Sequence, residues 1–305
     1  MLFSLTMNNQ TFVATIDINL AEKLKADLIQ QGFIITKPPY TIFSAKKKGV
    51  SCTLYTSGKL TVQGKEKHDF IAFYLEPEIL KVFTYSHPQH YIDKHARIGI
   101  DEAGKGDYFG PLCVSGVYAD EKGIAKLLSL GIRDSKKLSD NSVKKLAEKI
   151  GKEFPYSLVK ITPETYNKLY SKFKNLNSLL AWAHATAIEK LYDKTKCTQV
   201  TIDQFAHESV VKKAVQSKNL PIHLTQRHKG EEDPVVAAAS IIARSNFLTE
   251  LDKLSQSINI QLPKGASGIV QEKAQKIVNQ YGPDILQKIA KLHFKTTNEI
   301  LNQNN

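Results

Sequence analysis

Residues 98–107 read Ile-Gly-Ile-Asp-Glu-Ala-Gly-Lys-Gly-Asp, and this is the most informative stretch of the chain. Its apolar start predicts a strand that ends at two adjacent carboxylates, Asp101 and Glu102, followed at once by a glycine-lysine-glycine turn. Neighbouring side chains on a strand point to opposite faces, so the two carboxylates can share a ligand only if the backbone bends between them or just after. Gly104 and Gly106 supply that freedom. The pattern indicates a hard divalent cation beside a phosphate.

The overall composition is that of a basic globular protein. The chain has 305 residues, a length that predicts about two domains, and its hydrophobic fraction of 42% is enough to bury real cores. Lysine and arginine number 42 against 30 aspartate and glutamate, which gives a net charge of +12. Such an excess favours a polyanionic partner, nucleic acid or an anionic membrane, although a generally basic, solvated surface explains it equally well.

Other features bear on where the protein acts. No apolar run approaches the roughly 18 residues that a membrane span requires, so we expect no membrane association. The first residues lack the basic flank and apolar length of a secretory signal. Cys52, Cys113 and Cys197 are far apart and show no metal-binding spacing. These observations fit a reducing compartment and predict a cytoplasmic protein.

The pattern of apolar residues predicts two domains joined by a linker. Residues 1–85 read as a small α+β domain, with strands over 11–16, 40–45, 50–56 and 59–63 and a helix over 20–31. Residues 86–96 lack periodicity and read as the linker. Residues 97–305 alternate strands and helices, with strands over 98–101, 111–117, 156–161, 199–203 and 220–225 and helices over 141–150, 177–192 and 234–254. Further helices are expected from there to the end of the chain. The predicted fold class is α/β, with a mixed sheet because strands 98–101 and 111–117 form a hairpin.

Further carboxylates follow at a strand end and at a helix start. Asp203 ends the apolar strand 199–203, and ligands collect at that edge of α/β sheets. Glu231, Glu232 and Asp233 precede the helix that begins near residue 234, where only one of them can serve as the N-cap. Convergent carboxylate oxygens suit Mg²⁺ or Mn²⁺. Two such ions would activate a water and stabilise the leaving oxygen in phosphodiester cleavage.

Some conspicuous side chains have simpler explanations. The apolar spacing around Trp182 and His184 predicts that both pack in the core. His293 is also expected to be structural. Lys229 and Arg244 flank the acidic cluster, where phosphate contact and charge balance are equally consistent with the sequence.

Several ordered motifs resemble those of one nuclease family. Residues 101–107 with Gly-Pro-Leu at 110–112 resemble the opening motif of the type 2 ribonucleases H, and residues 134–138 and 237–244 are similar to its later blocks. Lysine at position 105, together with residues 175–182, 262–266 and 291–295, is similar to the ribonuclease HIII branch. Residues 57–60 resemble the strand-turn motif of TATA-binding-protein-like repeats, and one such domain precedes the catalytic domain in that branch.

The resemblance implies a ribonuclease H-like mixed sheet flanked by helices, preceded by a small α+β TATA-binding-protein-like domain that binds substrate. It implies a monomeric, metal-dependent endonuclease that cleaves the RNA strand of RNA/DNA hybrids and leaves 5′-phosphate and 3′-hydroxyl ends. Metal ligands would be Asp101, Glu102 and Asp203. The fourth catalytic carboxylate would be Glu231, with Glu232 as the alternative because the spacing to the following alanine run is about one residue short.

The same resemblance suggests which residues bind the substrate. They are Gly104, Lys105, Gly106, Ser135, Lys136 and Lys137. The glycines would bring backbone amides to the minor groove, where 2′-hydroxyls distinguish a hybrid from DNA. A structural tight turn explains the glycines but not the lysine between them. A solvated loop would equally explain Lys136 and Lys137, and a helix N-cap would explain Ser135.

Two other functions remain open at this stage. A non-catalytic nucleic-acid-binding protein would explain the positive charge, but it would leave carboxylates facing a polyanion without a reason. A ribonuclease HII-like enzyme that cuts at a single ribonucleotide within duplex DNA would share the same catalytic motifs.

Overall fold

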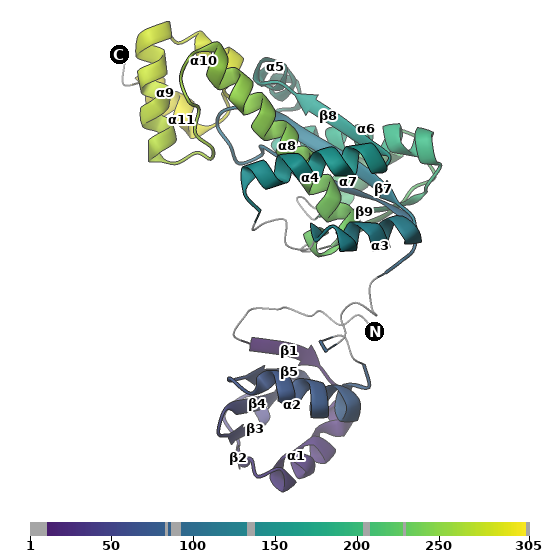
Figure 1. The fold of residues 1–305 in the computed structure, drawn as a ribbon. Coiled ribbons are helices and arrows are strands. Elements are labelled where there is room, and N and C mark those ends of the chain that lie inside the picture. Colours follow the sequence, from purple (N-terminus) through teal and green to yellow (C-terminus); the bar gives the residue numbers. More distant parts are fainter. Residues whose placement is uncertain are drawn as a thin grey trace. The chain divides into compact units, whose positions relative to one another are not determined.

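The computed structural model describes residues 11–82, 85–86, 93–132, 138–203, 208–227 and 230–302. The chain divides into two compact units, Met1–Asp93 and Lys94–Asn305. Each unit has its own sheet and its own hydrophobic core (Figure 1). None of the described helices is both long and apolar enough to cross a membrane.

The first unit is an antiparallel sheet of five strands in the order β1-β5-β4-β3-β2. Its strands are β1 (Thr11–Thr15), β2 (Ile34–Thr36), β3 (Thr41–Lys47), β4 (Val50–Tyr55) and β5 (Lys59–Gln63). Its helical segments are η1 (Ile18–Leu20), α1 (Ala21–Gln30), α2 (Lys67–Phe70) and η2 (Ile71–Leu80). Sequence analysis predicted four of the strands and α1 but missed β2, which has only three residues and lies just before two prolines.

The faces of this sheet differ because side chains alternate along each strand. In β4, Cys52 and Leu54 are fully buried in the core, while Ser51, Thr53 and Tyr55 on the other face are partly exposed. Thr53 lies opposite Thr61 on β5. One face of the sheet therefore holds the core, and the other carries hydroxyl side chains that remain accessible.

The second unit contains a mixed sheet in the order β10-β9-β6-β7-β8. Its strands are β6 (Arg97–Ala103), β7 (Leu112–Ala119), β8 (Tyr156–Ile161), β9 (Gln199–Asp203) and β10 (His223–Arg227). β6, β7 and β8 pair antiparallel, while β9 and β10 run parallel to β6. The predicted hairpin and the predicted mixed sheet are both confirmed.

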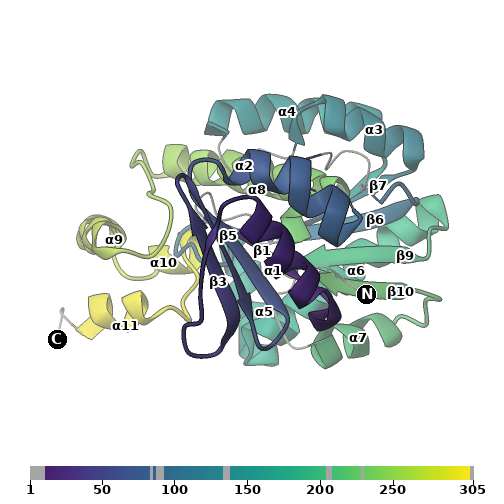
Figure 2. The same ribbon diagram turned by 90° about the horizontal axis from the view of Figure 1, so that it is seen from below.

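Helices cover both faces of this sheet, as Figure 2 shows. The helices are α3 (Glu121–Ser129), α4 (Asp140–Glu153), α5 (Pro163–Phe173), α6 (Leu176–Thr195), α7 (Glu208–Gln216), α8 (Pro234–Ser257), α9 (Gly268–Tyr281), α10 (Ile285–Ile289) and α11 (Lys295–Asn302). A short turn, η5 (Gly230–Glu232), precedes α8. Sequence analysis missed α3, α5 and α7. Thr162 caps α5 and Pro163 begins it, which is a helix-start signal that the sequence already carried.

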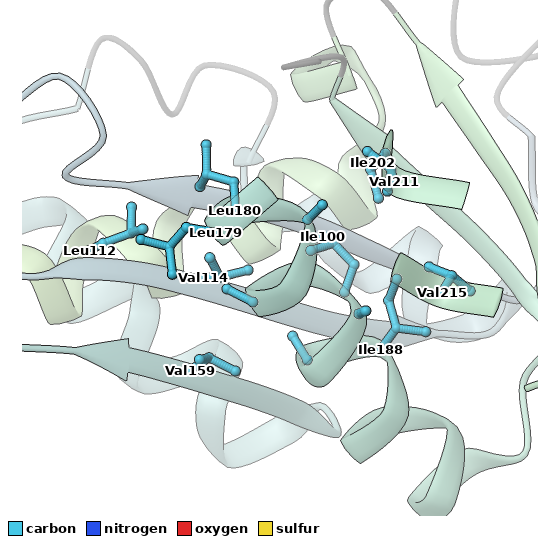
Figure 3. Close-up of a cluster of buried hydrophobic side chains, with 14 of the residues drawn as sticks. Ile100, Leu112, Val114, Val159, Leu179, Leu180, Ile188, Ile202, Val211 and Val215 are labelled. Carbon is cyan, nitrogen blue, oxygen red and sulfur yellow. The ribbon is translucent and has the colours of Figure 1, made fainter. Parts of the chain in front are cut away.

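The two long helices pack on opposite faces of β6. Ile98 and Ile100 lie in the cluster with Leu180 and Ile188 of α6, shown in part in Figure 3. Gly99 points the other way, because a Cβ atom built there would lie 2.4 Å from the backbone of Val235 on α8. The missing side chain lets α8 approach the strand directly. Alternate residues of β6 therefore face α6 and α8.

Candidate active site

The carboxyl ends of two neighbouring parallel strands bring the first two candidate residues together. Ile100 on β6 lies opposite Ile202 on β9, so the next residues along the strands, Asp101 and Asp203, lie at the same edge of the sheet. The backbone N–H of Gly230 donates to Asp203 Oδ1 at 2.7 Å. A Cβ atom at Gly230 would lie 2.7 Å from Asp203 Cα, so this close approach requires glycine.

Asp101 and Glu102 leave β6 on opposite faces. β6 continues to Ala103, which still pairs with Cys113, so the strand does not bend between the two carboxylates. The change of direction comes just after, at Gly104, whose φ is +88°. Asp101 faces α8 and accepts a hydrogen bond from Ser240 of that helix. Glu102 faces α6.

The pKa values of the two adjacent carboxylates, Asp101 and Glu102, are shifted in opposite directions. Burial, the neighbouring charge of Glu102 and the charge of Asp203 raise the pKa of Asp101 from 3.8 to about 7, against the opposing effect of the Ser240 hydrogen bond. Burial also acts to raise the pKa of Glu102, but His184 and Lys105 outweigh it and lower that pKa overall. Mutual repulsion of this kind is what a bound cation relieves.

The donor set fits a divalent cation. Carboxylate oxygens are the ligands that Mg²⁺ and Mn²⁺ prefer, and the charges of Glu102 and Asp203 both act on Asp101 at the sheet edge. Across the described residues, no group of three or more His, Cys, Asp or Glu side chains is close enough together to hold a metal ion by itself. The residues that could hold it are thus gathered at one edge but not drawn into a closed cluster.

The acidic cluster before α8 separates into different roles. Asp233 is the N-cap of the helix, where Oδ1 accepts from the N–H groups of Val235 at 2.9 Å and Val236 at 3.4 Å. Its other oxygen, Oδ2, accepts from Nε of the buried Arg97 at 2.8 Å. Glu232 is exposed on η5. The backbone of Glu231 follows directly on Gly230, which contacts Asp203, while its side chain lies outside the described part of the structure.

The two glycines of the glycine-lysine-glycine turn have different surroundings. A Cβ atom at Gly104 would lie 2.2 Å from the carbonyl oxygen of Pro111, so both the space and the positive φ require glycine there. At Gly106 a Cβ atom would meet nothing within 4 Å. A structural tight turn therefore explains the glycine at position 104. It does not explain the glycine at position 106, which faces open space. Lys105 lies between them with its Nζ 3.6 Å from Glu102 Oε1.

This turn is tied to a second loop near the end of α8. Asp107 Oδ1 accepts from the N–H of Gly265 at 2.6 Å, and the N–H of Tyr108 donates to the carbonyl of Gly265 at 2.9 Å. Lys264 in that loop pairs with Asp140 at 2.7 Å. Arg244 also pairs with Asp140, at 2.8 Å, which favours charge balance as its role. Residues 133–137 lie outside the described part, and with them Ser135, Lys136 and Lys137; the cap of α4 is Ser139.

Two buried polar residues near the site, His184 and Lys291, were not predicted to belong to it. His184 is fully buried on α6, as predicted for a core residue, yet its Nε2 lies 3.1 Å from Glu102 Oε2. Lys291 is also fully buried, and its Nζ donates to the carbonyl of Gly110 at 2.6 Å, in the segment between β6 and β7. His293 contacts Tyr166 and Tyr170 and is structural, as expected. A polar residue at a position where the helix pattern demands an apolar one was the available signal for His184.

A mixed five-stranded sheet with carboxylates at the ends of its adjacent parallel strands is the arrangement that the resemblance to the ribonucleases H implied. The Ribonuclease HII family model matches residues 98–297, and the model of a domain of unknown function, DUF3378, matches residues 11–85. Ribonuclease HIII of Protochlamydia amoebophila is 54% identical over 290 residues, covering 95% of this chain and 96% of that protein. Ribonuclease HIII of Chlamydia felis is 48% identical over 292 residues, covering 95% and 97%.

Solved structures agree with these relatives. The crystal structure of Bst-RNase HIII in complex with Mn²⁺ has a TM-score of 0.67 at 30% identity, covering 96% of this chain and 98% of that one. The structure of Aquifex aeolicus RNase H3 has a TM-score of 0.56 at 29% identity, covering 93% and 100%. The chain belongs to the ribonuclease HIII family and is an endoribonuclease of the ribonuclease H type.

Proposed function

We propose that the chain hydrolyses the RNA strand of RNA/DNA hybrids by a two-metal-ion mechanism that gives 5′-phosphate and 3′-hydroxyl ends. One observation carries the proposal: the pairing of Ile100 with Ile202 places Asp101 and Asp203 at the same sheet edge, with Glu102 next to Asp101 on β6. The Mn²⁺ complex of Bst-RNase HIII supports the use of a divalent cation, Mg²⁺ or Mn²⁺. When bound, such ions activate a water and stabilise the leaving oxygen.

The contacts described above support the following roles for the protein's own groups. Asp101, Glu102 and Asp203 would hold the cations. Gly230 fixes the orientation of Asp203 through its N–H, and Ser240 does the same for Asp101. The fourth catalytic carboxylate is Glu231, because its backbone adjoins the Gly230–Asp203 contact, with Glu232 as the alternative.

Substrate recognition is assigned to the turn after β6 and to residues 135–137, which lie outside the described part of the structure. The turn at Gly104, Lys105 and Gly106 brings backbone amides and the positively charged Lys105 side chain to the minor groove. The open space at Gly106 allows a sugar-phosphate strand to approach. Ser135, Lys136 and Lys137 bind phosphates. We further assign residues 1–85 as a substrate-binding domain, residues 86–96 as the linker and residues 97–305 as the catalytic domain of a monomer.

The proposal is tested by cleavage of an end-labelled RNA/DNA hybrid by wild type and by Asp203→Asn, each with Mg²⁺ or Mn²⁺ and with EDTA. Asp203→Asn should keep its circular dichroism spectrum and unfolding temperature and lose metal-dependent cleavage, because a ligand charge is removed from a shared site. A variant that still turns over the hybrid would refute the assignment. A parallel substrate with one embedded ribonucleotide separates this activity from a ribonuclease HII-like one.

A further inference from the structure

His184 stands out because a polar ring occupies a fully buried position on an apolar helix face. Leu180 and Ile188 lie one turn before and one turn after it on α6, and both are fully buried in the same core. A hydrocarbon side chain of the same size would fill this space without the cost of burying a polar group. Packing alone therefore does not explain a histidine here.

The contact that explains it is to Glu102. His184 Nε2 lies 3.1 Å from Glu102 Oε2. A carboxylate only accepts hydrogen bonds, so Nε2 carries the hydrogen and donates it. The other oxygen, Oε1, lies 3.6 Å from Nζ of the partly exposed Lys105. The carboxylate is thus held from the interior through one oxygen and from the surface side through the other.

Glu102 needs such a partner because of where β6 places it. It leaves the strand on the α6 face, opposite to Asp101, so its side chain has no support from α8, where Ser240 holds Asp101. The side chain of glutamate is also longer than that of aspartate and has more rotamers to restrict. Groups that hydrogen-bond to a metal ligand orient it, and their loss typically costs 10–100-fold in metal affinity or activity.

We propose that His184 is a positioning residue that fixes the Glu102 carboxylate for cation binding through its Nε2–H. The inference rests on the proposed function, since it assumes that Glu102 is a metal ligand. It gives α6 and α8 matching tasks: each helix supplies one hydrogen-bond donor to one of two adjacent carboxylates that point to opposite faces of the sheet.

A matched pair of substitutions separates this role from packing. His184→Gln places an amide N–H at about the same reach as Nε2, and His184→Met fills nearly the same volume as glutamine without a donor. For both variants, Mn²⁺ affinity is measured by calorimetry, kcat and KM on a hybrid are measured separately, and thermal unfolding is followed in EDTA. Ile188→Val on the same helix is the packing control and should lower the unfolding temperature without changing Mn²⁺ affinity.

We expect His184→Gln to stay within a few-fold of wild type in Mn²⁺ affinity and kcat, and His184→Met to lose about 10–100-fold, with KM little changed. The proposal is overturned if His184→Met binds Mn²⁺ as wild type does. It is also overturned if the two variants lose metal affinity and unfolding temperature equally, because the ring would then act through its shape. If wild type itself binds no Mn²⁺ and cleaves no hybrid, the proposed function fails and the inference fails with it.

Discussion

The buried carboxyl of Asp101 should make the metal-free protein less stable as pH rises. Its pKa is raised from 3.8 to about 7 by burial, by Glu102 and by Asp203. The folded state therefore holds this proton more tightly than the unfolded chain does. The resulting stabilisation is fully present below pH 3.8 and is lost as pH rises through about 7.

The size of the effect follows from the same two pKa values. One pKa unit corresponds to about 1.36 kcal/mol, so the wild type should lose on the order of 3 kcal/mol of unfolding free energy between about pH 5 and about pH 8. Asp101→Asn has no such proton to lose. The variant should therefore gain roughly that amount on the wild type over this interval, although it removes a ligand from the catalytic site.

Urea unfolding in EDTA at the two pH values measures this difference directly. Asp193→Asn, which changes an exposed carboxylate on α6, is the matched control and should track the wild type. At the higher pH, saturating Mn²⁺ should stabilise the wild type more than Asp101→Asn, because only the wild type has the ionised Asp101 carboxylate to bind the cation. An equal stability difference between wild type and Asp101→Asn at both pH values would show that the pKa of Asp101 is not raised in the folded protein.

Two further outcomes test the fold and the first unit. Gly99→Ala should lower the unfolding free energy by about 3 kcal/mol, because its Cβ would lie 2.4 Å from the Val235 backbone. Gly151→Ala inside α4 should raise the unfolding free energy by about 0.5–1 kcal/mol, because the closest atom there lies 3.4 Å away. Equal unfolding temperatures for the two variants would contradict the close packing of α8 on β6. Deleting residues 1–85 should raise KM for long hybrids far more than it lowers kcat. The difference in KM between the full chain and the deletion variant should shrink as salt rises, since the lost contacts would be mostly to phosphates. Steady-state kinetics at two salt concentrations check this, and an unchanged KM would show that residues 1–85 do not bind the substrate.

Local sequence signals predicted the frame of the catalytic unit. The alternation and length of the apolar runs predicted β6, β7, β8 and β9, and the short connection between β6 and β7 predicted their antiparallel pairing. These features depend on residues close together in the chain, so the sequence carries them in full. The missed helices α3, α5 and α7 have only 9, 11 and 9 residues, so their amphipathic pattern is short, although Thr162 and Pro163 did mark the start of α5.

The acidic cluster before α8 shows where local reasoning stops. The sequence indicates that one of Glu231, Glu232 and Asp233 caps the helix, and the position of Asp233 directly before Pro234 is a local signal for that cap. Tertiary structure adds the second partner of Asp233, because the buried Arg97, which begins β6, pairs with its other oxygen at 2.8 Å. That partner lies far away in the chain, so no spacing within the cluster could reveal it.

Residue periodicity and motif spacing predicted the fold class, the family and the carboxylates at the sheet edge, because both are properties of neighbouring residues. The packed structure was needed to show that Pro111 leaves no room for a side chain at Gly104 while Gly106 faces open space, and that the buried His184 reaches Glu102. Those contacts depend on how helices and strands that are distant in sequence pack together. The identity of a residue alone therefore cannot tell a core side chain from one that orients the active site.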